Sequence, residues 1–256
     1  MTWNPEKYLS FVNIRFRAAM DLIERIPHTD FKLIYDLGSG PGHVTQILQE
    51  RWQAARVIGV DNSAEMLSHA RREYPKVEWL PADIEAWRAQ GPPGLIFSNA
   101  ALHWVPDHEK LFLRLLNQLH PGGWLAVQMP RHIDDPGHLL ILEIADDRRW
   151  RGRFDQSAKL RVHSAEDYWD WLKPNSAQVD IWETIYHHEL EGENPVVNFF
   201  LGSQLRPYLD KLSEAEGQEF LARYGEKVAR AYPRQANGKT LFPFRRIFIL
   251  AQRNNG

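Results

Sequence analysis

Two spacings of apolar residues alternate along the first half of the chain, and they predict two kinds of element. Short apolar runs, each about the length of a buried strand, cover residues 33–37, 56–61, 77–80, 95–99 and 124–129. Between these runs, apolar residues recur three or four positions apart, as at Val44, Ile47 and Leu48, which is helical spacing. This regular alternation predicts an α/β fold: a Rossmann-like, mostly parallel sheet with helices on both faces.

The second half of the chain has longer helical stretches between its strands. Alternating and continuous apolar residues predict a sixth strand at 179–186 and a seventh at 243–251. We expect the helical insertions to fold over the ligand edge of the sheet as a cap. The expected boundaries within one domain, 1–256, are a core of about 28–130, 177–188 and 240–253, a cap of about 131–176 and 190–235, and a lid helix at 5–27.

A glycine-rich turn joins the first strand to the following helix. Gly38, Gly40 and Gly42 occupy alternate positions directly after the apolar run 33–37. Glycine suits a sharp turn or a close approach of the backbone to a ligand. The start of the next helix offers unpaired N–H groups and a partial positive charge, which favour an anionic group. An ordinary turn, a dinucleotide site and an S-adenosylmethionine (SAM) site are the three interpretations.

Two carboxylates near this turn distinguish between the ligands. Asp36 directly precedes the turn, and Asp61 ends the second strand, 19 residues beyond Gly42. The third glycine comes one residue earlier than in the dinucleotide fingerprint G-x-G-x-x-G. A carboxylate at Asp36 would repel a pyrophosphate but attract the ammonium group of a methionine moiety, while Asp61 could hold ribose hydroxyls. The pattern therefore favours SAM over a dinucleotide.

Further candidates follow the third and fourth strands, at the edge where open parallel sheets bind ligands. Asp83 could accept a hydrogen bond from the exocyclic amine of adenine, or could cap a short helix at 84–88. His103 and Trp104 follow the fourth strand. They could contact the ligands, or they could be packed walls of the core.

Charged residues outside the sheet allow two interpretations. Arg206 lies in a mostly apolar and aromatic run, and a buried arginine needs an anionic partner, either one of the chain's own acids or a substrate. Arg15 and Arg17 flank the polar side of the first helical stretch, where they could be solvated or could close over a ligand. The adjacent His187 and His188 would point to opposite faces of a strand, so we expect no metal site.

The string Asp36-Leu-Gly-Ser-Gly-Pro-Gly42, followed by Gly59-Val-Asp61, resembles motif I and the acidic end of the second strand in class I SAM-dependent methyltransferases. The resemblance implies that the chain binds SAM and releases S-adenosyl-L-homocysteine. It also implies a set of cofactor-binding residues. These are Tyr8, Arg17, Asp36, Gly38, Ser39, Gly40, Asp61, Asn62, Met66, Asp83, Ile84, Asn99 and Ala100.

Over nearly its full length, the chain also resembles the trans-aconitate 2-methyltransferase family. The motifs that carry it include Trp3-Asn-Pro, Trp104-Val-Pro-Asp-His108, Leu125-Ala-Val-Gln-Met-Pro130, Val179-Asp-Ile-Trp182 and Leu205-Arg-Pro-Tyr208. It implies O-methylation of one carboxylate of a small polycarboxylic acid, trans-aconitate above all, to a monomethyl ester. The implied catalytic residues are Trp104, His103 and Arg206. The implied substrate-binding residues are Tyr8, Arg15, Trp104, Arg131, Tyr186, Arg206 and Arg246.

Three short stretches depart from that family's pattern. They are His103, where glutamine is usual, Arg131-His132, where Asp-Asn is usual, and Gly202-Ser203-Gln204, where Gly-Thr-Gly is usual. All three lie near the expected acceptor site, so they concern the identity of the acid and leave the SAM chemistry intact.

Composition narrows the range of binding partners that the chain could have. The net charge is −2, and no run of Lys or Arg is long enough to follow a phosphate backbone. The absence of cysteine excludes disulfides, zinc–thiolate sites and a cysteine nucleophile, and it fits a reducing cytoplasm. The N-terminus is too polar for a signal peptide, and no apolar run approaches membrane-spanning length. We expect a cytoplasmic enzyme, a monomer or homodimer, that needs no metal, nucleic acid or membrane.

Three other functions remain as alternatives. A SAM-dependent methyltransferase for a neutral hydroxyl or amine would need a general base, for which His103 is the candidate. A SAM-binding regulator without turnover would keep the glycine turn but form no product. A nicotinamide-dependent oxidoreductase is disfavoured by the spacing of the glycines.

Overall fold

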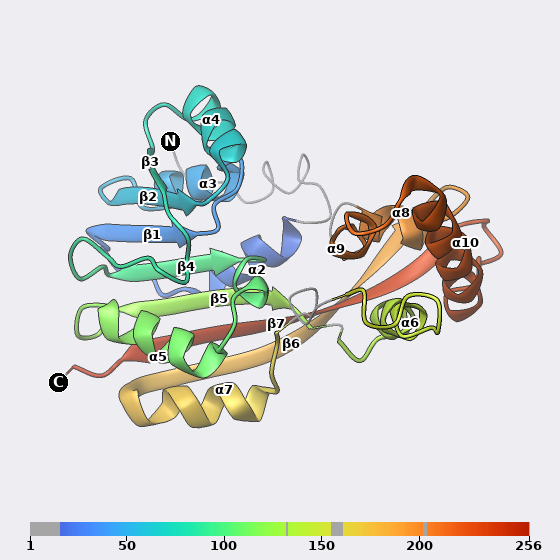
Figure 1. Cartoon of the computed structure of the whole chain (residues 1–256). Coiled ribbons are helices and arrows are strands. Elements are labelled where there is room, and N and C mark those ends of the chain that lie inside the picture. The colour runs from blue at the N-terminus through green and yellow to red at the C-terminus, as the bar shows by residue number, and fades with distance from the viewer. Residues whose placement is uncertain (1–15, 132, 155–160, 202–203, 256) are drawn as a thin grey trace. The chain divides into compact units, whose positions relative to one another are not determined.

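The computed structural model describes residues 16–131, 133–154, 161–201 and 204–255, and its central element is a seven-stranded sheet (Figure 1). The strands are β1 (Leu33–Leu37), β2 (Arg56–Asp61), β3 (Glu78–Pro81), β4 (Leu95–Asn99), β5 (Trp124–Pro130), β6 (Ser176–Leu190) and β7 (Thr240–Arg253). Their order is β3-β2-β1-β4-β5-β7-β6. The four neighbouring pairs from β3 to β5 are parallel. This arrangement confirms the α/β, Rossmann-like fold class predicted from the alternating pattern.

Helices connect the strands in the order that the pattern predicts. They are α2 (Arg17–Arg25), α3 (His43–Arg51), α4 (Ala64–Glu73), α5 (His108–Gln118), α6 (Pro136–Ala145), α7 (Ala165–Leu172), α8 (Pro195–Leu201), α9 (Arg206–Leu209) and α10 (Glu214–Ala231), with short 3-10 turns η1 (Leu102–Trp104) and η3 (Lys173–Asn175). No helix in the described part of the chain combines the length and the apolar character that crossing a bilayer requires.

Contacts divide the chain into two compact units. Unit 1 comprises 1–130, 161–183 and 247–256, and unit 2 comprises 131–160 and 184–246. The long strands β6 and β7 each contribute residues to both units. Residues 165–176, which the sequence pattern grouped with the cap, belong to unit 1.

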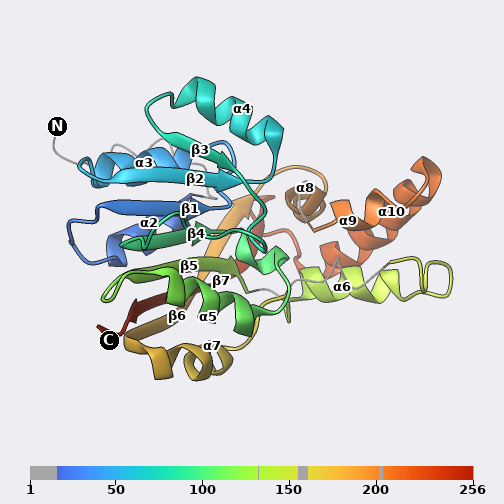
Figure 2. The same ribbon diagram turned by 60° about the vertical axis from the view of Figure 1, so that its left-hand side comes forward.

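The core of unit 1 lies on one face of the sheet. Tyr35 pairs in register with Ile96, and Ile96 pairs with Leu125, so their side chains share a face. They pack with Phe112 of α5 and Tyr168 of α7 into one apolar cluster. Figure 2 shows α5 and α7 along the same face of the sheet. Each fully buried large side chain contributes about 1.5–3 kcal/mol by leaving water, so this layer holds the strands firmly in register.

The opposite face of the sheet carries α2 and α3, which contact β5 and β2 respectively. Asp36 points to this face, one position out of phase with Tyr35 and Leu37. The Thr45 hydroxyl of α3 donates a hydrogen bond to the Asp36 carboxylate at 2.6 Å. Helices therefore cover both faces, and the site residues described below lie at the carboxyl ends of the strands.

Unit 2 has a core of its own, rich in aromatic residues. Helices α6 and α8 pack against α10. The buried side chains of this core include Trp150, Phe200, Phe220, Tyr224, Phe242 and Phe244. Ser213 and Glu216 form a reciprocal capping box at the start of α10, which satisfies two backbone N–H groups that a helix start leaves unpaired.

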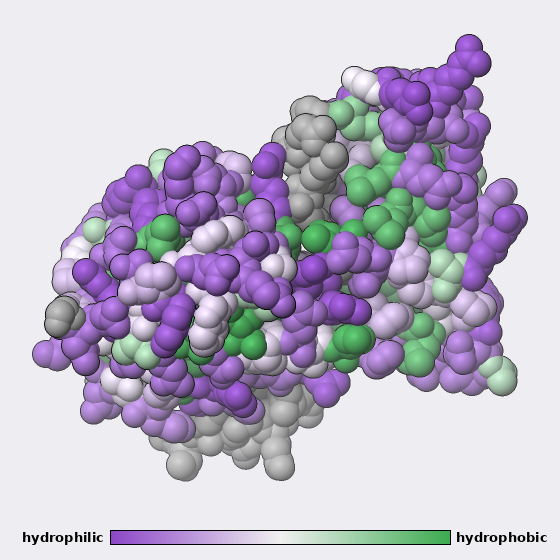
Figure 3. Space-filling model, turned by 90° about the horizontal axis from the view of Figure 1, so that it is seen from below, coloured by the Kyte–Doolittle hydropathy of each residue, from purple (hydrophilic) through white to green (hydrophobic). Residues whose placement is uncertain are grey.

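Figure 3 shows one face on which hydrophilic side chains dominate and apolar side chains lie in small areas. Among the described residues, Trp104 is a large apolar side chain with 42% exposure. An exposed tryptophan at the ligand edge of a sheet points to a binding surface.

Candidate active site

The glycine turn is fastened to the second strand. The backbone N–H groups of Gly38 and Ser39 both donate to the Val60 carbonyl, at 2.8 and 3.0 Å. Gly38, Gly40 and Gly42 all have positive φ angles, of 77°, 54° and 91°, where side chains with a Cβ are strained. The turn therefore requires the glycines that the sequence places there.

Gly38 is further restricted by a close neighbour. A Cβ at this position would lie 2.1 Å from the Cβ of Ala101, far inside van der Waals contact. The turn after β1 and the turn after β4 are thus packed directly against one another. Ala101 comes 63 residues later in the chain, so the sequence pattern alone does not reveal this contact.

Asp61 joins the glycine turn to the start of α4. Its two carboxylate oxygens accept the N–H groups of Gly40 and Ser63, each at 2.8 Å. A carboxylate has about four lone-pair positions, so two such bonds leave acceptor capacity. Asp61 is partly exposed at the pocket, where that capacity suits a pair of ribose hydroxyls.

The turn after β4 has an unusual backbone. Ala100 has a φ of 53°, a left-handed conformation that non-glycine residues seldom adopt and that clusters at functional sites. Its N–H donates to the Gln128 carbonyl of β5 at 2.9 Å, which holds the turn in place. This conformation directs the chain from β4 into η1, which carries His103 and Trp104.

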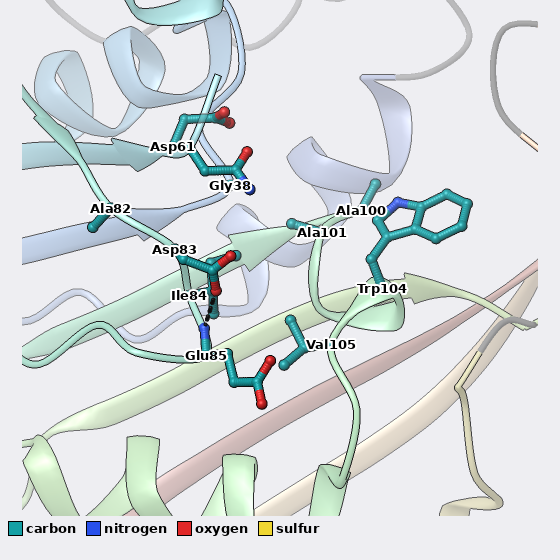
Figure 4. Close-up of a pocket in the computed structure, with 11 residues that line it drawn as sticks. Gly38, Asp61, Ala82, Asp83, Ile84, Glu85, Ala100, Ala101, Trp104 and Val105 are labelled. Atoms are coloured by element: carbon teal, nitrogen blue, oxygen red, sulfur yellow. Dashed lines mark hydrogen bonds between the residues drawn. The ribbon is translucent and has the colours of Figure 1, made fainter. Parts of the chain in front are cut away.

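A pocket of about 330 Å³ lies between these turns. Figure 4 shows Asp61 and Asp83 on one side of it and Ala100, Ala101 and Trp104 on the other. The lining residues are Gly38, Asp61, Asn62, Ala82, Asp83, Ile84, Glu85, Ala100, Ala101, Trp104 and Val105. The volume lies in the range of small-molecule sites. All of these residues belong to unit 1.

The charge of the pocket distinguishes between cofactors. Its described lining includes three carboxylates, Asp61, Asp83 and Glu85, and no lysine or arginine. Such a lining repels a pyrophosphate but tolerates a ligand with a sulfonium and an ammonium group. Ile84 and Val105 add apolar surface for an adenine ring. The pocket therefore fits SAM and disfavours a dinucleotide.

Asp83 makes a local hydrogen bond as well as lining the pocket. One of its carboxylate oxygens accepts the Glu85 N–H at 2.7 Å. Residues 84–86 form turns, and the expected short helix at 84–88 is absent from the described chain. The helix-cap interpretation of Asp83 was therefore wrong, while its position in the pocket is compatible with adenine binding.

Asp36 lies beneath the glycine turn, outside the set of pocket-lining residues. It is 2% exposed and is bonded to Thr45. Burial, reinforced by the nearby Asp61 and partly offset by the Thr45 hydrogen bond, raises the pKa of Asp36 to about 7. Its assigned contact with the methionine ammonium group stays a prediction.

Other residues assigned to the cofactor occupy mixed positions. The Ser39 hydroxyl and the Asn99 side-chain oxygen are buried without a hydrogen-bond partner among the described residues, as expected of groups that await a ligand. Arg17 and Met66 are exposed and are not part of the pocket lining. Tyr8, like the substrate candidate Arg15, lies outside the described residues. The roles assigned to these residues stay predictions.

His103 and Trp104 are adjacent but differently placed. Trp104 lines the pocket, whereas the buried His103 is not among the lining residues. The centroids of the two rings are 4.7 Å apart. Of the two, Trp104 has the position expected of a residue that contacts a ligand.

His108 was not identified from the sequence, and its side chain is hydrogen-bonded to the η1 turn on its buried side. Its Nε2 donates to the Leu102 carbonyl at 3.0 Å, so its Nδ1 accepts the hydroxyl of Tyr168 at 2.6 Å. Burial lowers the pKa of His108 to about 4, so the ring is neutral at pH 7. The histidine followed Trp104-Val-Pro in the sequence, but only the fold brings Tyr168 to it.

Four residues assigned to the acceptor belong to unit 2, namely Arg131, Tyr186, Arg206 and Arg246. The buried Arg246 has its guanidinium carbon 4.3 Å from the centre of the Phe244 ring, and Tyr186 is buried beside His188. Arg131 pairs with Asp134 at 2.8 Å. Their contact with an acceptor stays a prediction.

Arg206 requires a correction. The expectation that it is buried was wrong, because its side chain is 73% exposed and lies 3.6 Å from Asp210, which directly follows α9. Leu205 and Tyr208 are three positions apart and face the core, which turns Arg206 outward. The anion that Arg206 faces is therefore a carboxylate of the chain itself, Asp210.

Comparison with known proteins agrees with the fold and the pocket. A family model described as "Methyltransferase domain" matches residues 34–123, which run from β1 to the residue before β5. The YcgJ protein from Bacillus subtilis superimposes with a TM-score of 0.60 at 14% identity, covering 93% of this chain and 98% of that chain. Phosphoethanolamine N-methyltransferase 2 of Haemonchus contortus, solved with S-adenosylhomocysteine, gives 0.55 at 16% identity, with coverages of 92% and 52%.

Full-length relatives are considerably closer in sequence. The trans-aconitate 2-methyltransferase of Azoarcus sp. is 44% identical over 98% of this chain and 99% of its own. The Escherichia coli protein of the same name is 39% identical over 98% of each chain.

The fold and the acidic, glycine-bounded pocket define an enzyme of the class I SAM-dependent methyltransferases. At 39–44% identity over almost the whole length, the chain belongs to the trans-aconitate 2-methyltransferase family.

Proposed function

We propose that the enzyme transfers the methyl group of SAM to a carboxylate of trans-aconitate, forming a monomethyl ester and S-adenosyl-L-homocysteine. The observation that carries this proposal is the 44% identity with a trans-aconitate 2-methyltransferase over almost the full length of both chains. The pocket of unit 1 supports the donor half of the reaction. The arginines of unit 2 support the acceptor half.

SAM supplies an electrophilic methyl group on a positively charged sulfur. For the donor, Asp61 would accept hydrogen bonds from the ribose hydroxyls, and Asp83 from the exocyclic amine of adenine. Ile84 and Val105 would contact the adenine faces. The positive φ of Gly38 and the absence of its side chain allow the backbone to approach the donor closely.

The acceptor needs orientation more than activation. A carboxylate has a pKa of roughly 4 and is ionised at pH 7, so no general base is required. The chain must place one carboxylate oxygen in line with the methyl group and exclude water, which is catalysis by proximity. Trp104, exposed at the pocket, would form a wall against which the acceptor lies.

We propose that unit 2, with the N-terminal segment that contains Tyr8 and Arg15, acts as the cap that binds the acceptor. Arg131, Tyr186, Arg206 and Arg246 would bind the carboxylates that do not react. Arg246 is the strongest candidate, because its side chain is buried and the attraction between a guanidinium and a carboxylate is stronger away from bulk water. Arg206 would have to exchange Asp210 for the acceptor.

We further propose that the enzyme works in the cytoplasm as a monomer or homodimer, on a small molecule and without nucleic acid. The lack of cysteine and the even mixture of charges support this.

The alternative acceptor is a neutral hydroxyl or amine, with His103 as base. The 44% identity with a trans-aconitate 2-methyltransferase favours the carboxylate. The test is methyl transfer from tritium-labelled SAM to a panel of di- and tricarboxylic acids and neutral alcohols. We expect trans-aconitate to give the highest kcat/KM, with less than about a tenfold loss in His103→Ala. Preference for a neutral acceptor, together with loss of activity in His103→Ala, would overturn the proposal.

A further inference from the structure

Gln128, near the end of β5, has a buried side chain whose polar atoms lack hydrogen-bond partners among the described residues. It is 0% exposed, and neither its Nε2 nor its Oε1 has a hydrogen-bond partner among the described residues. Buried amides are almost always paired, because an unpaired one loses its hydrogen bonds to water without replacement. An amide that the fold leaves doubly unpaired is placed for a ligand.

The register of the sheet locates this amide. Gln128 pairs with Asn99 of β4, so their side chains share the face of the sheet that carries Asp36. The Asn99 side-chain oxygen and the Ser39 hydroxyl are also buried without partners among the described residues. The Gln128 carbonyl accepts the N–H of Ala100, which lines the pocket. Gln128 therefore adjoins the site at the end of β5.

The order of the strands indicates which ligand meets Gln128. The pocket is lined from the ends of β3, β2, β1 and β4, which the donor covers. The next strand in the sheet is β5, and neighbouring strands lie about 4.8 Å apart. A molecule that attacks the methyl group from beyond the donor would come to lie at the end of β5.

We infer that Gln128 binds the acceptor, donating its Nε2 hydrogen to the carboxylate that receives the methyl group. This inference rests on the proposed function. In the reaction a carboxylate oxygen forms the new O–C bond, the S–C bond breaks with its electron pair retained by sulfur, and the two opposite charges cancel without proton transfer. A cation at this position would hold back the negative charge that the oxygen must share, whereas a neutral amide orients the oxygen and still bonds to the ester carbonyl.

The test compares Gln128→Met and Gln128→Glu with the wild-type enzyme. Gln128→Met keeps the length of the side chain and removes the hydrogen bond. The matched control is Gln118→Met. The Gln118 side chain is half-buried in the same unit, and its Nε2 also lacks a partner among the described residues, but its oxygen accepts the Ala89 N–H. For each protein the KM for trans-aconitate, the Kd for SAM by calorimetry and the Tm are measured.

We expect Gln128→Met to raise the KM for trans-aconitate by about 10–100-fold and to change the Kd for SAM less than twofold. Its Tm should rise by roughly 2–4 °C, because an unpaired buried amide is removed. Gln118→Met should lower the Tm and leave KM unchanged. Gln128→Glu should be impaired at pH 8 and recover towards pH 6, since a protonated glutamic acid again donates a hydrogen bond.

An unchanged KM for trans-aconitate in Gln128→Met, whether or not the affinity for SAM is weakened, would overturn the inference. Ester formation by the wild-type enzyme would still uphold the proposed function in that case. A wild-type enzyme that binds SAM but forms no ester from trans-aconitate would overturn the proposed function and this inference with it.

Discussion

Single residues at the site are constrained by neighbours that are distant in the sequence. Gly38 and Ala101 touch across two turns, and Asp36 is buried by α3 and the sheet. The turn that follows β4 at the pocket has a strained backbone at Ala100, whose φ is 53°. Residue-scale tests should therefore report on the fold and the site together.

Gly38→Ala and Gly40→Ala form a matched pair. Both positions have a positive φ, which disfavours alanine by about 1–2 kcal/mol. Only at Gly38 would the new Cβ meet another atom, 2.1 Å away, while nothing lies within 4 Å at Gly40. In urea unfolding we expect a loss of about 1–2 kcal/mol for Gly40→Ala and about 1–3 kcal/mol more for Gly38→Ala. Equal losses would show that the two turns are not in contact.

Asp36 should make stability fall as pH rises. Its pKa is raised from 3.8 to about 7 in the folded chain, so between these values the folded state binds more protons than the unfolded state, and stability decreases with pH. The shift corresponds to roughly 4 kcal/mol between pH 4 and 7, at 1.36 kcal/mol per unit. Above pH 8 this contribution is constant.

The measurement is the free energy of unfolding of the wild-type protein and Asp36→Asn from pH 4 to 8. The asparagine keeps an oxygen that accepts the Thr45 hydroxyl but does not titrate. We expect the variant to gain stability relative to the wild type as pH rises, whereas the exposed Asp30→Asn should follow the wild type throughout. Parallel profiles for Asp36→Asn and the wild type would contradict the raised pKa.

At the scale of elements, η1 is held by α7 through His108. Tyr168 of α7 donates its hydroxyl to His108 Nδ1 and accepts the His163 N–H at 3.2 Å. The same histidine donates to Leu102, so α7 supports the turn that carries Trp104 to the pocket.

Tyr168→Phe removes that hydroxyl while keeping the buried ring. Because His108 Nδ1 loses its donor inside the core, we expect the free energy of unfolding to fall by about 1–3 kcal/mol. The Kd for SAM, measured by calorimetry, should rise severalfold as the η1 turn loosens. Trp169→Leu, a substitution of an exposed residue on the same helix, should change neither quantity. A stable Tyr168→Phe variant would show that the turn needs no support from α7.

Elements defined by local pattern were predicted well. The run 33–37, the three glycines and the spacing of Val44, Ile47 and Leu48 together predict β1, its turn and α3, because strand, turn and helix signals are all local. The chemistry of carboxylates at strand ends predicted Asp61 and Asp83, and the resemblance to class I methyltransferases implied Asn62, Ile84 and Ala100; all five line the pocket. Ala82, Ala101 and Val105 were missed, because small apolar residues become binding surface only through tertiary contacts.

For Arg206, by contrast, the local sequence pattern gave a wrong prediction. Its apolar surroundings in the sequence predicted burial, but α9 has only four residues, and the buried side chains here are Tyr208 and the preceding Leu205. The average polarity of a run does not reveal which side of a short helix a residue occupies.

At the scale of the whole molecule, the chain combines two units with separate cores. Unit 1 contains every residue of the acidic pocket, and unit 2 contains Arg131, Arg206 and Arg246. The sequence predicted the seven-stranded sheet because alternating strands and helices admit few arrangements. The grouping of residues 165–176 with the sheet depended on the burial of Tyr168 and Leu172, which a helical pattern alone does not determine.

In the proposed reaction, SAM bound in the pocket of unit 1 gives its methyl group to a carboxylate oxygen of trans-aconitate. The most direct measurement is ¹³C NMR of the product formed from trans-aconitate and SAM labelled with ¹³C in its methyl group. We predict a single new resonance in the methyl ester region, formed in step with S-adenosyl-L-homocysteine and absent without enzyme. Label on any other atom of the acceptor, or S-adenosyl-L-homocysteine released without an ester, would contradict the account.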